Sequence, residues 1–205
     1  MTVIDKEKQV FLLGFHNHLP FGIQKDKYAD SLIKDHISSI IDLIDFLNNS
    51  NQIKIALHLS GNLISYLDKR YPDFSSKVRA LLDRNQLELL SSGIYEPIVP
   101  FTPKEDRQMQ LQLMNRLLSH IYGYTPNGAW ITEYSWEPSF TLDLAKSRIQ
   151  YTCLPKEYFT YAGLQEDEIS GYYLTEEEGS KEEKRFFLKR FLPFSLPFTL
   201  LLPFH

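Results

Sequence analysis

The chain has 205 residues, of which 43% are hydrophobic, and this length is enough to bury a sizeable core in one domain. Its formal net charge of −4 gives no reason to expect nucleic acid or an anionic membrane surface as a partner. The single cysteine, Cys153, excludes an internal disulfide framework and fits a reducing compartment.

The two ends of the sequence show no targeting or membrane-spanning signal. The stretch Met1–Val10 lacks the long apolar core and the small-residue cleavage site of a secretory signal, so we expect a cytoplasmic protein. The stretch Phe191–Phe204 is apolar, but it is too short to span a bilayer and contains several prolines. We therefore expect no membrane partner.

The predicted elements alternate between short apolar runs, which suit buried strands, and longer segments with apolar residues at helical spacing. In chain order they are a strand at Gln9–Phe15, a helix at Lys27–Leu47, a strand at Ile53–His58, a helical region at Leu63–Arg84 broken near Tyr71 and Pro72, a strand at Leu87–Leu90, a helix from Thr102 to Ile121 that Gly123 ends, a strand at Ala129–Thr132, a helix at Ser139–Ser147 and a strand at Tyr151–Leu154. Thr102 as N-cap and Pro103 at the first helical position predict the start of the longest later helix. This alternation favours a parallel sheet covered by helices, either an open sheet or a barrel.

Beyond Gly163 the alternation weakens. The charge runs Glu166–Glu168 and Glu176–Lys184 predict solvated loops or a hairpin turn. The tail Phe186–His205 is rich in Phe, Leu and Pro, and two interpretations remain open for it. It is either a buried strand or out-of-frame sequence joined to a shortened gene. We expect one partial domain over residues 1–205, best defined over 1–163.

Polar or titratable groups follow four consecutive predicted strands. His16 and His18 come after the first strand, His58 ends the second, Glu96 follows the third and Glu133 follows the fourth. Barrel enzymes assemble their sites at the carboxyl ends of parallel strands, and doubly wound sheets place ligands there as well. The pattern therefore predicts a site at this end of the sheet without choosing between the two architectures.

Glu133 lies between the two tryptophans of the protein, Trp130 and Trp136. Indole rings offer flat apolar surfaces on which a sugar can stack, and a retaining glycosidase needs an ionised carboxylate to attack the anomeric carbon. Two core tryptophans beside a solvent-facing glutamate would give the same spacing, and spacing alone does not decide between the two interpretations.

Glu96 precedes Pro97, which restricts its backbone and suits a carboxylate aligned on sugar hydroxyls, although an exposed turn glutamate is the simpler alternative. The three histidines at strand ends, His16, His18 and His58, suit a metal site, hydrogen bonds to a sugar, or the edge of a core. No aspartate or cysteine cluster supports a metal, so we predict no metal ligand and no cofactor.

Several of these segments together resemble glycoside hydrolase family 57, closest to its 4-alpha-glucanotransferase and alpha-amylase branch. The matching motifs are His16-Asn17-His18-Leu19-Pro20, Gly93-Ile94-Tyr95-Glu96-Pro97, Pro103-Lys104-Glu105-Asp106-Arg107 and Trp130-Ile131-Thr132-Glu133 with Trp136. Their order and spacing match through about Gly163. The resemblance implies an incomplete seven-stranded (β/α) barrel and a retaining double-displacement mechanism on alpha-linked glucans.

The resemblance also implies roles for individual residues. Glu133 matches the catalytic nucleophile and His18 the histidine of the first conserved region, while Glu96 and Trp136 match sugar-contacting positions. Two further residues are expected to line the pocket, His16 and His58. We add Trp130 as a substrate-binding candidate because it stands beside the nucleophile.

The sequence departs from the family pattern at several points. Leu19 stands where the family usually has glutamine, Tyr134 follows the nucleophile where arginine is common, and Pro155-Lys156-Glu157 replaces an acidic pair. The family's general acid/base is an aspartate in a later strand, and no residue here matches its motif. We therefore expect the N-terminal part of a barrel, truncated on its C-terminal side, with a second polypeptide as a candidate partner that completes it.

The functional expectation is a hydrolase or transferase acting on an alpha-glucan or a maltooligosaccharide. The alternative from a different class is a non-catalytic carbohydrate-binding remnant in which Trp130, Tyr134 and Trp136 hold the glucan. A metal-dependent polysaccharide deacetylase and an unstable product of a broken gene rank below these two.

Overall fold

The computed structural model describes residues 13–20, 30–165, 169, 172–175 and 186–190. In chain order its elements are β1 (Gly14–Asn17), α1 (Asp30–Asn48), β2 (Ile55–Leu59), α2 (Gly61–Arg70), α3 (Pro72–Asp83), β3 (Leu87–Leu90), the 3₁₀ helix η2 (Val99–Phe101), α4 (Lys104–Tyr122), β4 (Gly128–Ala129), the 3₁₀ helix η3 (Thr132–Tyr134), α5 (Phe140–Lys146), β5 (Tyr151–Leu154), α6 (Lys156–Tyr161), β6 (Tyr172–Thr175) and β7 (Phe186–Arg190).

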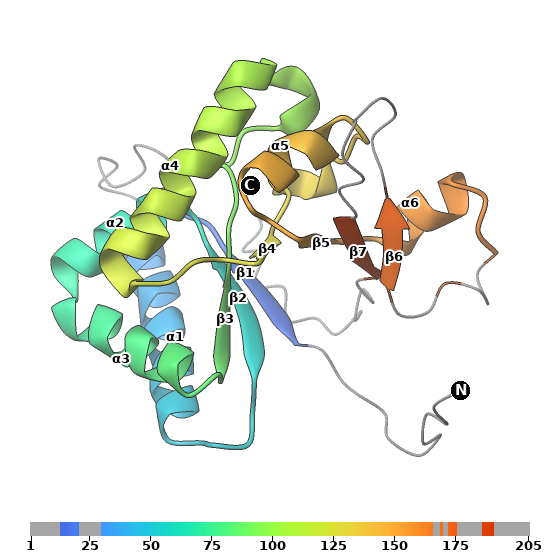
Figure 1. The fold of residues 1–205 in the computed structure, drawn as a ribbon. Helices are drawn as coiled ribbons and strands as arrows, with labels where there is room; N and C mark the ends of the chain where they lie inside the picture. Colours follow the sequence, from blue (N-terminus) through green and yellow to red (C-terminus); the bar gives the residue numbers. More distant parts are fainter. Residues whose placement is uncertain (1–12, 21–29, 166–168, 170–171, 176–185, 191–205) are drawn as a thin grey trace.

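The strands form two sheets, ordered β1-β2-β3 and β4-β5-β7-β6. All neighbours run parallel except β6 and β7, which pair antiparallel. A parallel bridge between Ser91 and Ala129 joins the end of β3 to β4, so β1 to β5 follow one another in chain order (Figure 1). The architecture is the incomplete parallel α/β barrel expected from the sequence.

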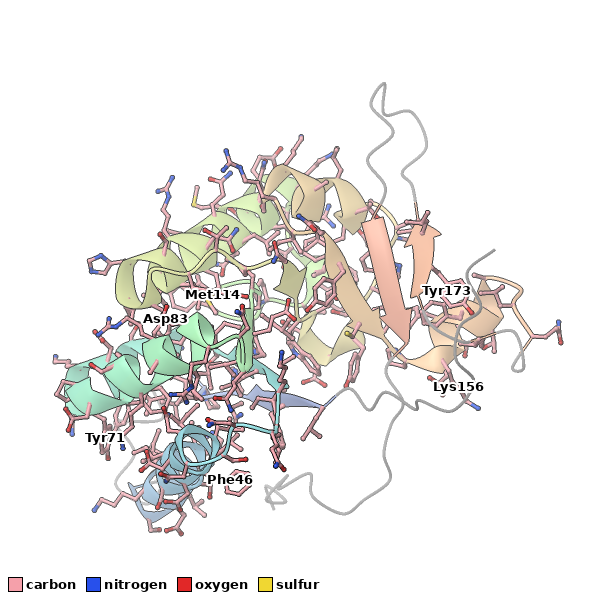
Figure 2. All side chains as sticks on the ribbon, turned by 60° about the horizontal axis from the view of Figure 1, so that its bottom comes forward. Phe46, Tyr71, Asp83, Met114, Lys156 and Tyr173 are labelled. Carbon is pink, nitrogen blue, oxygen red and sulfur yellow. The ribbon has the colours of Figure 1, made fainter. Side chains whose placement is uncertain are left out.

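Two hydrophobic clusters hold the sheets to their helices. The first packs α1, α2, α3 and α4 against β2 and β3, and the second joins α5 and α6 to β4 and β5. Met114 and Tyr173 mark these two parts of the molecule in Figure 2. Helix α1 shows why the first cluster forms, since one face of it is apolar at helical spacing and fully buried, through Ile33, Ile37, Ile40, Ile44 and Leu47.

The strand that carries His16 lies later in the chain than predicted. The sequence predicted a strand at Gln9–Phe15, whereas β1 extends from Gly14 to Asn17 and residues 1–12 lie outside the described part. His16 is thus a strand residue, and the β1–β2 register pairs it with His58. Parallel neighbours in register project to the same face, so the pairing itself brings these two histidines together.

The long helix α4 begins differently from the prediction. It starts at Lys104 without a side-chain cap, because the Thr102 hydroxyl donates to the Ile98 carbonyl, 2.8 Å away. The predicted threonine cap is therefore wrong. Gly123 ends the helix as predicted, with a left-handed φ of 66°. The break at Tyr71 and Pro72 is also confirmed, since Pro72 opens α3.

The C-terminal tail begins with a strand. β7 pairs parallel with β5 and antiparallel with β6, which confirms the strand interpretation for residues 186–190. The charge run at 176–185 joins β6 to β7, as the hairpin prediction requires, but that run and 191–205 lie outside the described residues. Among the helices that the structure describes, none combines the length and the apolar character needed to cross a bilayer.

Candidate active site

The histidines of β1 and β2 form a stack with Trp130 at the carboxyl edge of the sheet. The Nδ1 atoms of His16 and His58 are 2.8 Å apart, and their rings lie 4.9 Å apart at 13°. The other neighbour of His16 is the Trp130 indole, 4.5 Å away at 12°. His16 is thus held between two flat rings, which fixes the plane of its imidazole.

Glu96 joins this stack from the loop after β3. Its side chain is only 3% exposed, and one carboxylate oxygen, Oε2, contacts His18 Nδ1. The other, Oε1, lies 3.7 Å from His16 Nδ1 and 3.6 Å from His58 Nδ1, and it has no hydrogen-bond partner among the residues that the structure describes. The structure therefore overturns the simpler alternative of an exposed turn glutamate.

The backbone of this loop is tight and strained. Glu96 has a φ of 52°, which is uncommon for a residue with a side chain, and its N–H donates to the Gly93 carbonyl at 2.9 Å. Any side chain at Gly93 would collide with the Pro97 ring. Gly93 and Pro97 thus close the loop that points Glu96 at the histidines.

A further polar contact lies behind the histidines. His58 and Ser92 are fully buried, and His58 Nε2 lies 2.8 Å from the Ser92 hydroxyl. That hydroxyl donates to the Gly93 carbonyl at 2.9 Å. The structure buries His58 completely between His16 and Ser92, and its expected place in the lining of the pocket stays a prediction.

Burial keeps the histidines of the site neutral. Desolvation, helped by the neighbouring His18, lowers the pKa of His16 to about 4. The pKa of His58 lies well below its usual value, again mainly because of burial. Burial also lowers the pKa of His18, but the carboxylate of Glu133 opposes that shift. At pH 7 the imidazoles of His16 and His58 therefore act as neutral hydrogen-bonding groups.

Glu133 lies at the carboxyl end of the next strand, β4. It lies in η3, directly after β4, and its side chain is exposed. Both Glu133 and Tyr134 have left-handed backbone angles, with φ of 53° and 51°. Two consecutive residues of this kind store strain, which proteins keep mainly where function requires it. The Glu133 carboxylate acts on this cluster only through its charge, which raises the pKa of His18 against the effect of burial.

The turn that carries Glu133 is braced on its far side. The Tyr158 hydroxyl of α6 donates to the Tyr134 carbonyl at 2.5 Å and accepts from the Trp136 N–H at 3.4 Å. The Trp136 ring is half-buried and packs against the second hydrophobic cluster. The hydroxyl thus spans the segment that follows the nucleophile candidate.

An ion pair with α4 anchors the same segment. Arg107 Nη1 lies 2.6 Å from Glu137 Oε1, and Arg107 Nε lies 3.5 Å from an oxygen of the fully buried Asp143. Arg107 also borders a cavity of about 10 Å³ beside Trp130, room for a single water molecule. The arginine therefore connects the turn to α4 and to α5 at once.

Three side chains of the site meet a geometric requirement for metal ligands. Ligand atoms of His16, His58 and Glu96 all lie within 4.8 Å of one another. The 2.8 Å between the two Nδ1 atoms, however, matches a shared proton. Two nitrogens on a tetrahedral zinc ion stand about 3.3 Å apart, given Zn–N bonds of about 2.05 Å. The absence of a bound metal stays a prediction.

Comparison with known proteins identifies the family. The sequence profile described as glycosyl hydrolase family 57 matches residues 12–199. The chain belongs to this family. The match extends past Gly163, where the sequence motifs end, and includes the strands β6 and β7.

Relatives within family 57 carry names of starch-processing enzymes. The chain is 33% identical to alpha-amylase 1 of Dictyoglomus thermophilum over 95% of its own length, and 34% identical to an alpha-amylase of Pyrococcus furiosus over 84%. The crystal structure of 4-alpha-glucanotransferase from Thermococcus litoralis superposes with a TM-score of 0.72 at 28% identity, covering 87% of this chain. The chain spans about a quarter of the length of these proteins, 27%, 26% and 27% respectively.

Most of the residues predicted for the family 57 site meet in the fold. The structure gathers five of them around the β1–β4 edge, His16, His18, His58, Glu96 and Trp130, and Glu133 lies in the turn η3 that follows β4. Trp136 lies on the segment after Glu133 and packs against the second hydrophobic cluster. The individual roles of these residues in binding and catalysis stay predictions.

Sequence analysis missed the supporting residues Ser92 and Tyr158. Ser92 closely follows the apolar strand Leu87–Leu90, and this position at a strand end was the only signal that the sequence offered for it. Tyr158 gave no signal, because its contact with Tyr134 joins positions 24 residues apart through a helix that was not predicted.

Proposed function

We propose that this chain is the nucleophile-bearing part of a retaining enzyme that acts on alpha-linked glucans, with Glu133 as the nucleophile. In the first step a carboxylate oxygen of Glu133 attacks the anomeric carbon, the bond to the leaving-group oxygen breaks, and a glycosyl–enzyme ester forms. Water or a sugar hydroxyl then releases the glycosyl group with its original anomeric configuration, giving hydrolysis or transfer.

One observation carries this proposal: the exposed Glu133 stands in a strained left-handed turn that follows β4. A nucleophile must be accessible, ionised and held in place, and a left-handed turn braced by its neighbours meets the last requirement. The charge of Glu133 raises the pKa of His18 against the effect of burial, and His18 is in turn in contact with Glu96.

The remaining site residues suit a bound sugar. Glu96 and His18 offer groups that align hydroxyls, and the half-buried Trp136 offers an apolar face for a pyranose ring. A retaining mechanism also requires a second carboxyl group as acid/base, which the family pattern puts in a later strand. A second polypeptide that completes the barrel is a candidate source for it.

Covalent labelling tests Glu133 without the acid/base. A 5-fluoro-α-glucosyl fluoride carries a leaving group that departs without protonation, so attack by the nucleophile alone is enough to trap the ester. We expect one glycosyl group per chain, located on the peptide that contains Glu133 by mass spectrometry. The Glu133→Gln variant should not be labelled, while the matched exposed variant Glu105→Gln should label like the parent.

Two outcomes would contradict the proposal. Labelling at another residue would reassign the nucleophile. If the parent chain bound maltooligosaccharides with the same affinity as Glu133→Gln and never formed the ester, the non-catalytic carbohydrate-binding alternative would replace the enzyme.

A further inference from the structure

The buried contacts behind His16 form one continuous chain of hydrogen bonds. It runs from the Gly93 carbonyl to the Ser92 hydroxyl at 2.9 Å, on to His58 Nε2 at 2.8 Å, and from His58 Nδ1 to His16 Nδ1 at 2.8 Å. The far nitrogen of His16, Nε2, is the end of the chain, and the His16 side chain keeps 32% of its exposure. The inner members Ser92 and His58 are fully buried.

The hydrogen bonds of this series can be donated in only two directions, inward toward Gly93 or outward toward His16. The Ser92 hydroxyl has a single hydrogen, and giving it to Gly93 leaves its oxygen to accept from His58 Nε2–H. A neutral His58 then has a bare Nδ1, which accepts from His16 Nδ1–H and leaves His16 Nε2 unprotonated. The reverse direction puts the serine hydrogen on His58 and makes His16 Nε2 a donor.

The first direction forms one more hydrogen bond than the second. With the protons running inward, the contacts to Gly93, His58 and His16 are all hydrogen bonds, whereas the reverse loses the bond from Ser92 to Gly93. The Gly93 carbonyl keeps the bond from the Glu96 N–H in either direction, so the two directions differ by one hydrogen bond, which favours the inward one. The two imidazoles are neutral at pH 7, as both arguments require.

We propose that Ser92 is a positioning residue which, through His58, keeps the proton of His16 on Nδ1 and presents Nε2 as a hydrogen-bond acceptor. On the proposed function, the partner of this acceptor is a sugar hydroxyl that donates its hydrogen to His16. Glu96 Oε1 lies 3.7 Å from His16 Nδ1 but is buried, so the acceptor that this side of the site offers to a hydroxyl donor is His16 Nε2. The tautomer itself does not depend on the proposed function.

Nitrogen-15 NMR of the chain labelled at histidine tests the proton positions directly. In the free protein at pH 7 we expect His16 to show a protonated Nδ1 and a bare Nε2, and His58 the opposite pattern. The variants His16→Gln and His58→Gln assign the two sets of signals. Because no ligand is present, this result stands whether or not glucan labelling at Glu133 succeeds.

We expect Ser92→Ala to reverse the direction in which these hydrogen bonds are donated. Without the serine oxygen, a proton on His58 Nε2 has no acceptor, so it moves to Nδ1, donates to His16, and turns His16 into an Nε2–H donor. Both NMR patterns should exchange. Ser65→Ala is the matched control, since Ser65 donates to the Gly61 carbonyl within α2 and should leave both patterns as in the parent.

Three results would overturn the inference. One is a parent protein in which His16 carries its proton on Nε2. Another is a pair of bare Nδ1 atoms together with stoichiometric zinc in the purified protein, which would make the cluster a metal site. The third is a Ser92→Ala protein with unchanged histidine signals. If Ser92→Ala fails to fold, the parent spectrum and its zinc content still decide.

Discussion

The loop after β3 and the turn after β4 each hold a glutamate at the same left-handed backbone angle, with φ of 52° at Glu96 and 53° at Glu133. Their surroundings are opposite. The side chain of Glu96 is 3% exposed and lies among three histidines, whereas Glu133 is exposed and is held only through its backbone and neighbours.

This difference separates two ways of placing a carboxylate. At Glu96 the tertiary contacts of the side chain compensate the strained backbone, so the residue is part of what holds the loop. At Glu133 the strain is held by neighbours, namely the Tyr158 hydroxyl and the Arg107 ion pair, and the carboxylate stays free to react. Variants that remove these supporting contacts test whether the two glutamates differ in this way.

The largest effect is expected for Arg107→Ala. It removes the cation beside Asp143, which is fully buried, and the anchor of the segment that follows Glu133. Breaking a buried ion pair from one side typically destabilises by ~3 kcal/mol. Urea unfolding should show this loss, and Arg116→Ala, an exposed position on the same helix, should change stability by a few tenths of a kcal/mol. Equal losses in both variants would show that Arg107 anchors nothing.

Glycine substitutions compare the two glutamates directly. Glycine relieves the left-handed strain at either position, but Glu96→Gly also removes a buried carboxylate and its contact with His18. We expect Glu96→Gly to lose ~2 kcal/mol of unfolding free energy, since bonds to charged groups contribute about that much. Glu133→Gly should instead gain roughly 0.5–1 kcal/mol while abolishing labelling. Losses of the same size at both positions would remove the contrast between them.

The sequence was informative where local pattern decides structure. Strands β2, β3 and β5 follow apolar runs, and the motif around Glu133 marks the nucleophile candidate without any fold. Prediction from the sequence failed where tertiary contacts determine the structure. His16 reads as a loop residue because a polar side chain ends the apolar run, yet pairing with β2 makes it part of a strand. The burial of Glu96 and the role of Ser92 depend on contacts between separate strands and loops, which no local pattern contains.

A smaller effect is expected at the brace of the turn. Tyr158→Phe removes the hydroxyl that joins the Tyr134 carbonyl to the Trp136 N–H, and we expect a loss of ~1 kcal/mol. The rate of labelling at Glu133 should fall as well, because the strained turn loses a support. Tyr161→Phe, at a ring that is 86% exposed, is the control and should alter neither quantity. Unchanged labelling in Tyr158→Phe would show that the brace does not position the nucleophile.

The smallest effect concerns how acid acts on the histidine side of the comparison. The folded protein holds His16 at a pKa of about 4, below its ordinary value of 6.5, so the unfolded chain binds this proton first as the pH falls. The unfolding free energy should therefore be highest above pH 6.5 and decrease between pH 6.5 and about 4, with His18 and His58 adding to the same decrease. Since the His16 side chain keeps 32% of its exposure, its own share is partial. His16→Gln should give a shallower decrease across this window, measured by urea unfolding at a series of pH values. A slope that did not change in His16→Gln would mean that His16 takes up its proton equally well in the folded and unfolded chains. His16 would then not be held neutral by its buried surroundings.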